Sequence, residues 1–267
     1  MEMYRFIILI ISITLSNVTM AQDNEIMGSA EYHYIINNER GVSFSMPYRL
    51  YFTKDIAMYE KTGDAKLIKD SRPKTEMRGG VRITTKIRVL QSNVQPYYYT
   101  NLITNDLIFR ETVSSKLYTI KDSIETIPWK LHSEYKNISK YKCQKATALF
   151  RGRKYTAWFT TEIPVSHDPW KLRGLPGLIM KAYDHTRKYE FEIAKVNLNA
   201  DSKVIQEKTS VPTSKKIQEM KVYIDAIKNE QKNTLARARA TLPRGARLEE
   251  ECEECPKTQQ RNIEIFN

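Results

Sequence analysis

The sequence predicts a mainly β protein: a curled antiparallel sheet, either an open barrel or sandwich-like, with one C-terminal amphipathic helix. Between residues 30 and 196 the chain repeats short runs rich in Tyr, Ile, Val, Thr and Phe, each bounded by Asn, Asp, Gly or Pro. After Pro212 the apolar residues recur at helical spacing instead. A sheet of many strands hides its apolar face by curling or by folding onto itself.

The strand candidates follow one another through short connections, which predicts an antiparallel meander. They are residues 30–36, 48–59, 81–90, 97–102, 107–112, 116–121, 129–135, 142–150, 154–161, 178–183 and 189–196. The clearest hairpin turns contain Asn105 and Gly152, because Asn and Gly tolerate a positive φ. Residues 61–80 mix glycines with charges and are expected to form a long mobile loop.

The ends of the chain differ in character from this β domain, which we assign to residues 22–212. Residues 1–21 combine Arg5 with the short apolar run 6–11 and are expected to be a signal peptide, the alternative being a retained anchor. No lipobox Cys lies near the expected cleavage point, and the mature chain has no second long apolar run. A periplasmic or secreted protein is therefore expected.

The helix is expected within residues 213–242, followed by a polar tail, 243–267, that we expect to be disordered. Ile217, Met220, Ile224 and Ile227 recur on one helical face. We expect this stripe to pack on the domain rather than on a membrane or a partner. Pro243 then breaks the helical pattern.

The chain is basic, with 267 residues and a formal net charge of +12, and much of the excess lies within residues 61–88. For an envelope protein the expected partners are an envelope protein, a peptide, a lipid or an anionic glycan, with peripheral contact to a membrane surface; nucleic acid is not expected. The alternative is that the lysines serve only solubility.

The stretch 173–179 sets a turn directly against an apolar run. Gly174, Leu175, Pro176, Gly177, Leu178 and Ile179 form this structural motif. Pro at the second and Gly at the third position predict a type II turn in which Gly177 has a positive φ. Alternation from residue 178 predicts a strand, and residues 184–187 turn the chain into a return strand. The motif therefore opens a hairpin and carries no catalytic group.

The motif and its flanks resemble the GLPGLI family of secreted Bacteroidetes proteins. Besides residues 174–179, the matching stretches are YKCQKAT (141–147), RGRKYTAWFT (151–160), EIP (162–164) and PWKL (169–172). The resemblance is specific from about residue 129 to 196 and departs at Asp168, where the family commonly has Gly. It implies no assigned reaction.

Three cysteines are present. Cys252 and Cys255 lie among glutamates, which disfavours a redox-active thiolate, and no His stands nearby to complete a metal site. We expect a local disulfide between them, with a metal site as the alternative. Cys143 is expected to be a small buried side chain.

His167 and Asp168 precede the motif, and Asp184 and His185 end the strand after it. These four residues would form a metal or acid-base site if they converged, the alternative being two solvated turns. No nucleophile, Walker or dinucleotide motif accompanies them. We therefore predict no catalytic residue and no cofactor, and leave the metal question open.

These observations favour a non-catalytic binding or carrier module of the cell envelope, whose aromatic side chains hold part of a peptide, lipid or glycan. The candidate binding residues are Trp158, Trp170, His167, Asp168, Asp184 and His185, with the aromatic run 97–99 beside them. The alternative is an envelope hydrolase or metal-handling protein that uses the loop His and Asp residues.

Overall fold

The structure is a computed structural model that describes residues 26–38, 41–72, 75–78, 81–84, 94–214, 216–240 and 263–266. The expected signal peptide, Cys252 and Cys255 lie outside the described residues.

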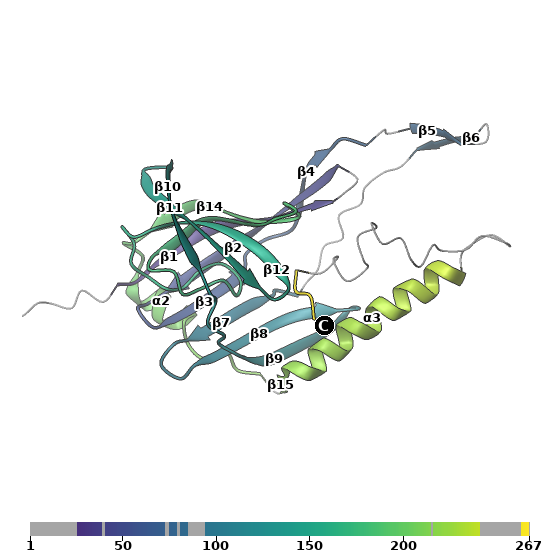
Figure 1. The fold of residues 1–267 in the computed structure, drawn as a ribbon. Coiled ribbons are helices and arrows are strands. Elements are labelled where there is room, and N and C mark those ends of the chain that lie inside the picture. The colour runs from purple at the N-terminus through teal and green to yellow at the C-terminus, as the bar shows by residue number, and fades with distance from the viewer. Residues whose placement is uncertain are drawn as a thin grey trace, which may run out of the picture.

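The described chain is mostly strand (Figure 1). The strands are β1 Gly28–Asn38, β2 Val42–Phe52, β3 Ile56–Lys61, β4 Lys66–Asp70, β5 Thr75–Arg78, β6 Val81–Thr84, β7 Tyr97–Asn101, β8 Asp106–Val113, β9 Lys116–Ser123, β10 Lys130–Ile138, β11 Tyr141–Phe150, β12 Arg153–Thr160, β13 Leu178–Asp184, β14 Tyr189–Asn197 and β15 Gln218–Glu219. The helices are α2 Ser202–Lys208 and α3 Met220–Ala240.

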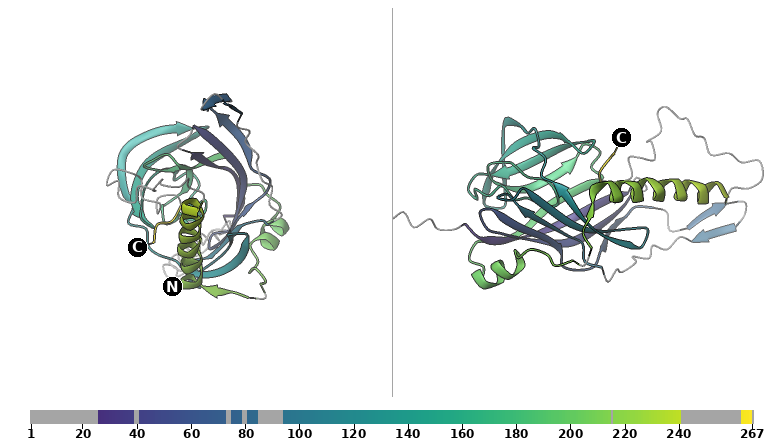
Figure 2. Two further views of the ribbon diagram at one scale, coloured as in Figure 1. Left: turned by 90° about the vertical axis from the view of Figure 1, so that its right-hand side faces the viewer. Right: turned by 90° about the horizontal axis from the view of Figure 1, so that it is seen from below.

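One 13-stranded sheet has the order β10-β11-β12-β13-β14-β1-β2-β3-β7-β8-β9-β15, and β4 pairs with β2 beside this path. Its neighbours run antiparallel, apart from the short β15, which lies parallel to β9. The sheet curls into a trough without closing, as the end-on view in Figure 2 shows. The predicted curled antiparallel sheet is confirmed.

Local turn chemistry explains the confirmed hairpins. Asn105 has φ 57 between β7 and β8, and Arg151 and Gly152 have φ 47 and φ 76 between β11 and β12. Positive φ at both central residues gives a two-residue turn the twist of the strands that it joins.

The chain between residues 48 and 80 differs from the prediction. The expected strand 48–59 is two strands, because Thr53, Lys54 and Asp55 form a tight turn in which the Thr53 N–H donates to the Ile56 carbonyl at 2.8 Å. The expected loop 61–80 contains β4 and β5. β4 pairs with Val42–Ser45 of β2, the part of that strand edge that β3 leaves free.

The helical prediction is partly wrong. α3 begins at Met220, and Ile217 lies before it with 44% of its surface exposed. Tyr223 and Ile227 are the buried residues of the face that packs on β8 and β9. Helix α2, which begins after its N-cap Asp201, was not predicted at all. Among the described residues no helix is long and apolar enough to cross a membrane.

The expected disorder of the tail is wrong for residues 263–266. Glu264 is 3% exposed, and the Ile265 N–H donates to the Arg151 carbonyl at 3.0 Å. These residues pack against the β11–β12 hairpin because Glu264 meets buried cations there.

The glycine motif differs from the prediction in its backbone. Positive φ falls at Gly174 (φ 85) and not at Gly177. Gly177 is needed for another reason: a Cβ there would lie 2.0 Å from the Thr160 carbonyl oxygen. The predicted hairpin is confirmed, since β13 and β14 pair from Lys181 to Tyr183.

Alanine substitutions separate these two roles of glycine. Gly177→Ala forces two backbones apart, so we expect it to lower the free energy of unfolding by on the order of 3 kcal/mol or more. Gly174→Ala meets no atom within 4 Å and bears only the cost of a positive φ, about 1 kcal/mol. Urea unfolding measures both changes. Equal losses in the free energy of unfolding of the two variants would contradict the close approach of the Gly177 and Thr160 backbones.

Candidate functional site

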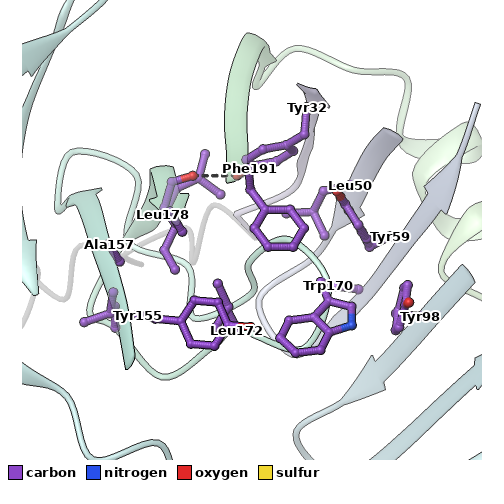
Figure 3. Close-up of a cluster of buried hydrophobic side chains, with 14 of the residues drawn as sticks. Tyr32, Leu50, Tyr59, Tyr98, Tyr155, Ala157, Trp170, Leu172, Leu178 and Phe191 are labelled. Atoms are coloured by element: carbon purple, nitrogen blue, oxygen red, sulfur yellow. Dashed lines mark hydrogen bonds between the residues drawn. The ribbon is translucent and has the colours of Figure 1, made fainter. Parts of the chain in front are cut away.

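Residues 161–177, between β12 and β13, fold into the trough and fill one end of it. Trp170 is 4% exposed and has φ 62, a strained value for a large side chain. Its ring lies 5.9 Å from Phe150 and 6.2 Å, stacked, from Phe191. Figure 3 shows Trp170 between Leu172 and Tyr98 in the core. This packing holds the loop in place.

Lys171 lies among acidic groups at the inner side of this loop. Its side chain is 0% exposed, and its Nζ lies 2.9 Å from Glu264 and 3.3 Å from Asp122. Arg151 joins the cluster at 3.1 Å from Asp122 and 3.7 Å from Glu264. Burial raises the pKa of Glu264, although Lys171 opposes this. The cluster is a buried network of charges that depend on one another.

Asp168 substitutes for a missing strand neighbour at the start of β13. Pairing with β14 covers only Lys181 to Tyr183, so Ile179 lies beyond it. The Ile179 N–H donates to Asp168 Oδ1 at 2.7 Å, and its carbonyl accepts from the Tyr32 hydroxyl at 2.7 Å. Burial raises the pKa of Asp168 well above its ordinary value. Asp168 therefore fixes the end of the motif, where β13 begins.

The other end of the trough remains open and forms what we call the mouth cleft, two cavities of about 380 and 290 Å³ that share lining residues. Tyr34, Glu111, Thr112 and Ile263 line both cavities. The larger is bounded further by Ile36, Val113, Ser114, Tyr189, Tyr223, Ile227, Glu230, Gln231, Thr234 and Glu264, and the smaller by Met46, Tyr48, Tyr59, Lys61, Val94, Pro96, Tyr98, Trp170 and Phe191. The sheet, α3 and residues 263–266 thus enclose it together.

Aromatic rings line the cleft. Tyr34 stacks on Phe191 at 4.9 Å, and Tyr48 stacks on Tyr59 at 4.7 Å. Offset and edge contacts of this kind keep large apolar surfaces rigid. The aromatic part of the lining is therefore a rigid, largely apolar surface.

Glu111 is a carboxylate on this aromatic wall. It accepts hydrogen bonds from the hydroxyls of Tyr98 and Tyr223, one on each oxygen. Burial, and next the charge of Glu111, raise the pKa of both tyrosines well above the ordinary value. The tyrosines therefore remain donors and the carboxylate remains an acceptor.

The four predicted loop residues do not converge. Asp168 binds the backbone near the start of β13, whereas Asp184 ends that strand, roughly 16 Å away for extended chain. Asp184 pairs with buried Arg153 at 2.9 Å, and His185 is exposed. Within the described ranges no three His, Cys, Asp or Glu residues group as metal ligands do. The geometry contradicts a shared metal or acid-base site.

The predicted aromatic residues do not all lie at the cleft. Trp170 and Tyr98 line the smaller cavity, whereas Tyr97 and Tyr99 belong to a separate cluster with Met58. Trp158 lies outside the cleft, with Lys136 Nζ 4.0 Å from its ring centre. Strand alternation explains the split within β7, because neighbouring side chains point to opposite faces.

Sequence reasoning missed the residues that define the cleft. Tyr223 was visible in the helical stripe, three residues after Met220. Glu111 follows buried Leu107 and Phe109 at two-residue spacing, so alternation placed a carboxylate on the inner face. No local signal marked Lys171 or Glu264, since their contact spans 93 residues. Cys143 is buried and free, as predicted.

Comparison with known proteins adds a match to one family. The model of the family described as "Protein of unknown function (Porph_ging)" matches residues 151–181. This matched stretch runs from the β11–β12 turn into β13 and includes the motif on which the resemblance to the GLPGLI family rests. No curated protein matches the chain.

Among solved structures, two described as "Structure of PNGF-II", in C2 and P21 space groups, are each 14% identical with a TM-score of 0.43. Each match covers 77% of this chain, which spans about a third of theirs, 33% and 34%. A putative outer membrane lipoprotein-sorting protein domain from Vibrio parahaemolyticus is 7% identical, with a TM-score of 0.29, over 69% of this chain and 91% of that one.

The buried His167 predicts a pH-dependent loss of stability. Burial lowers its pKa to about 4 from 6.5, so the folded protein keeps the ring neutral while the unfolded chain takes up a proton. This stability is present above pH 6.5 and is lost as the pH falls through about 4. The shift corresponds to roughly 3 kcal/mol.

Urea unfolding of wild type and His167→Gln between pH 7 and pH 4 measures this loss. We expect the difference in free energy between the two proteins to change by roughly 3 kcal/mol over that range. The opposite contribution of Asp168 cancels because both proteins contain it. His185→Gln, at an exposed site, serves as the control. If the free energies of unfolding of wild type and His167→Gln change in parallel with pH, His167 is not the group that causes the loss of stability.

Proposed function

We propose that this protein is a non-catalytic binding or carrier module that holds the apolar part of a ligand in the mouth cleft. The observation that carries the proposal is the open, aromatic-lined half of a trough whose other half is filled by the loop 161–177. A core of this kind packs densely unless the space serves a guest. The cavities, about 380 and 290 Å³, are of the size that small ligands and single chains occupy.

The chemistry of the lining supports binding over catalysis. The rings of Tyr34, Tyr48 and Phe191 offer apolar contact. Each Glu111 oxygen accepts a hydrogen bond from a tyrosine hydroxyl, which gives the carboxylate a structural role on the wall. The ligand class that fits is a lipid or an apolar peptide segment. Its place would be the cell envelope, on the strength of the expected signal peptide.

Substitutions on opposite faces of β1 test the cleft. Ile36 lines the larger cavity, so Ile36→Trp fills space that the ligand needs. Its neighbour Ile35 lies on the other face, and Ile35→Trp is the matched control. Titration with N-phenyl-1-naphthylamine, an uncharged apolar fluorophore, should show saturable binding that Ile36→Trp weakens on the order of tenfold, or about 1.4 kcal/mol. Equal affinities in the three proteins would place the probe elsewhere.

We further propose that β4 makes peripheral contact with an anionic membrane surface, from which the ligand is taken or to which it is given. Lys66 and Lys69 are exposed there beside Leu67 and Ile68, which are 41% and 54% exposed. A strand that mixes cations with exposed apolar side chains suits a lipid interface. β4 and the far half of α3 both project beyond the trough on the same side (Figures 1 and 2).

Charge reversal tests this contact. Lys66→Glu with Lys69→Glu should reduce cosedimentation with phosphatidylglycerol vesicles at least tenfold at low salt, because each basic residue contributes about 1 kcal/mol near such a surface. Lys130→Glu with Lys154→Glu makes the same change of charge at exposed sites on β10 and β12. If both pairs reduce binding equally, only net charge matters and β4 is not the contact.

A further inference from the structure

We propose a binding site for an amphiphilic anion, in which Lys171 and Arg151 bind a carboxylate or phosphate head and the mouth cleft holds the apolar body. Residues Ile263–Phe266 of the same chain occupy this site in the structure. This inference rests on the proposed function and specifies the ligand class. The segment itself has this chemistry, since its sequence is Ile-Glu-Ile-Phe.

The head site is built from buried cations. Both Glu264 oxygens lie within hydrogen-bond distance of Lys171 Nζ, at 2.9 and 3.1 Å. Arg151 Nη1 lies 3.7 Å from the same carboxylate, and its side chain is 9% exposed. Lys171 is also 3.8 Å from the centre of the Phe109 ring. A cation in such surroundings requires an anionic partner.

The body of the segment lies where the two cavities meet. Ile263 lines both of them, so its side chain occupies space on the route between them. The backbone is held by the Ile265 N–H, which donates to the Arg151 carbonyl at 3.0 Å, and by the Tyr155 hydroxyl, which donates to the Ile263 carbonyl at 3.3 Å. Gly152 leaves room for it, because a Cβ there would lie 2.6 Å from Ile265 Cβ.

When a ligand replaces Glu264, the net charge of the site stays the same only if the ligand is an anion. When Glu264 leaves, Asp122 remains on both cations and Glu125 remains on Arg151 at 2.7 Å. A carboxylate or phosphate monoanion restores the charge that Glu264 supplied. An uncharged ligand of the same shape leaves that position empty, so the site discriminates by charge.

A matched pair of probes tests the inference: 11-(dansylamino)undecanoate and its methyl ester, which share the chain and differ in the head. We compare the full chain with a variant that ends at residue 262. The ratio of the ester Kd to the carboxylate Kd should rise at least tenfold in the shortened protein, because the acid no longer competes with Glu264. Adding the peptide Ile-Glu-Ile-Phe should reverse the gain.

Two full-length variants keep the test decisive if the shortened protein is unfolded by circular dichroism. Glu264→Gln removes only the competing charge. Gly152→Asn places a Cβ against Ile265 while Asn tolerates the positive φ of the turn. Each should raise the same ratio at least threefold.

Two results would overturn the inference. The first is a ratio of the ester Kd to the carboxylate Kd that is unchanged in the shortened protein when that protein is folded. The second applies if the shortened protein is unfolded: the same ratio is then unchanged in both full-length variants. Either would make residues 263–266 a structural part of the wall. Binding of the methyl ester distinguishes failure of this inference from failure of the proposed function. If the ester binds to the full chain and Ile36→Trp weakens that binding, the cleft is a binding site whether or not residues 263–266 compete with the ligand.

Discussion

The close contact between the backbones of Gly177 and Thr160 determines how the interior of this protein is built. A Cβ at residue 177 would overlap the Thr160 carbonyl oxygen at 2.0 Å, so the path by which the loop 161–177 leaves β12 and re-enters as β13 requires glycine at this position. That path carries Trp170 and Leu172 into the trough, where both are buried. An open sheet of 13 strands encloses more space than its own side chains fill. The loop fills one end, and the mouth cleft is what remains.

Buried charges fix this arrangement more stringently than apolar packing alone. Arg153 and Asp184 are 2% and 0% exposed and pair at 2.9 Å, and Lys171 lies between Asp122 and Glu264. Removing one partner from such a pair typically costs 3–5 kcal/mol (order of magnitude), because the remaining charge stays desolvated. Apolar side chains tolerate small shifts, whereas the contacts of Lys171 keep their geometry only when the loop, β9 and residues 263–266 are placed together. The polar contacts therefore select one position for the loop.

The sequence was informative where the determinants are local. Alternating side chains predicted most strands, and Asn105 and Gly152 marked their hairpins because the turns need positive φ. Pro176-Gly177 suggested a type II turn, but the actual requirement at Gly177 comes from the backbone of Thr160 on the neighbouring strand β12. The cleft depends on contacts such as that between Tyr223 and Glu111, 112 residues apart. The burial of polar loop residues such as Lys171 could not be predicted, because their buried partners lie far away in the sequence.

The hydrogen bonds of Glu111 show why a carboxylate in an aromatic cleft need not indicate proton chemistry. Each oxygen of Glu111 accepts from one hydroxyl, that of Tyr98 on β7 or that of Tyr223 on α3. These hydroxyls have pKa values well above the ordinary value, because of burial and the Glu111 charge, and so remain donors. The carboxylate therefore joins the helix to the sheet, and the opening of the cleft depends on that joint staying intact.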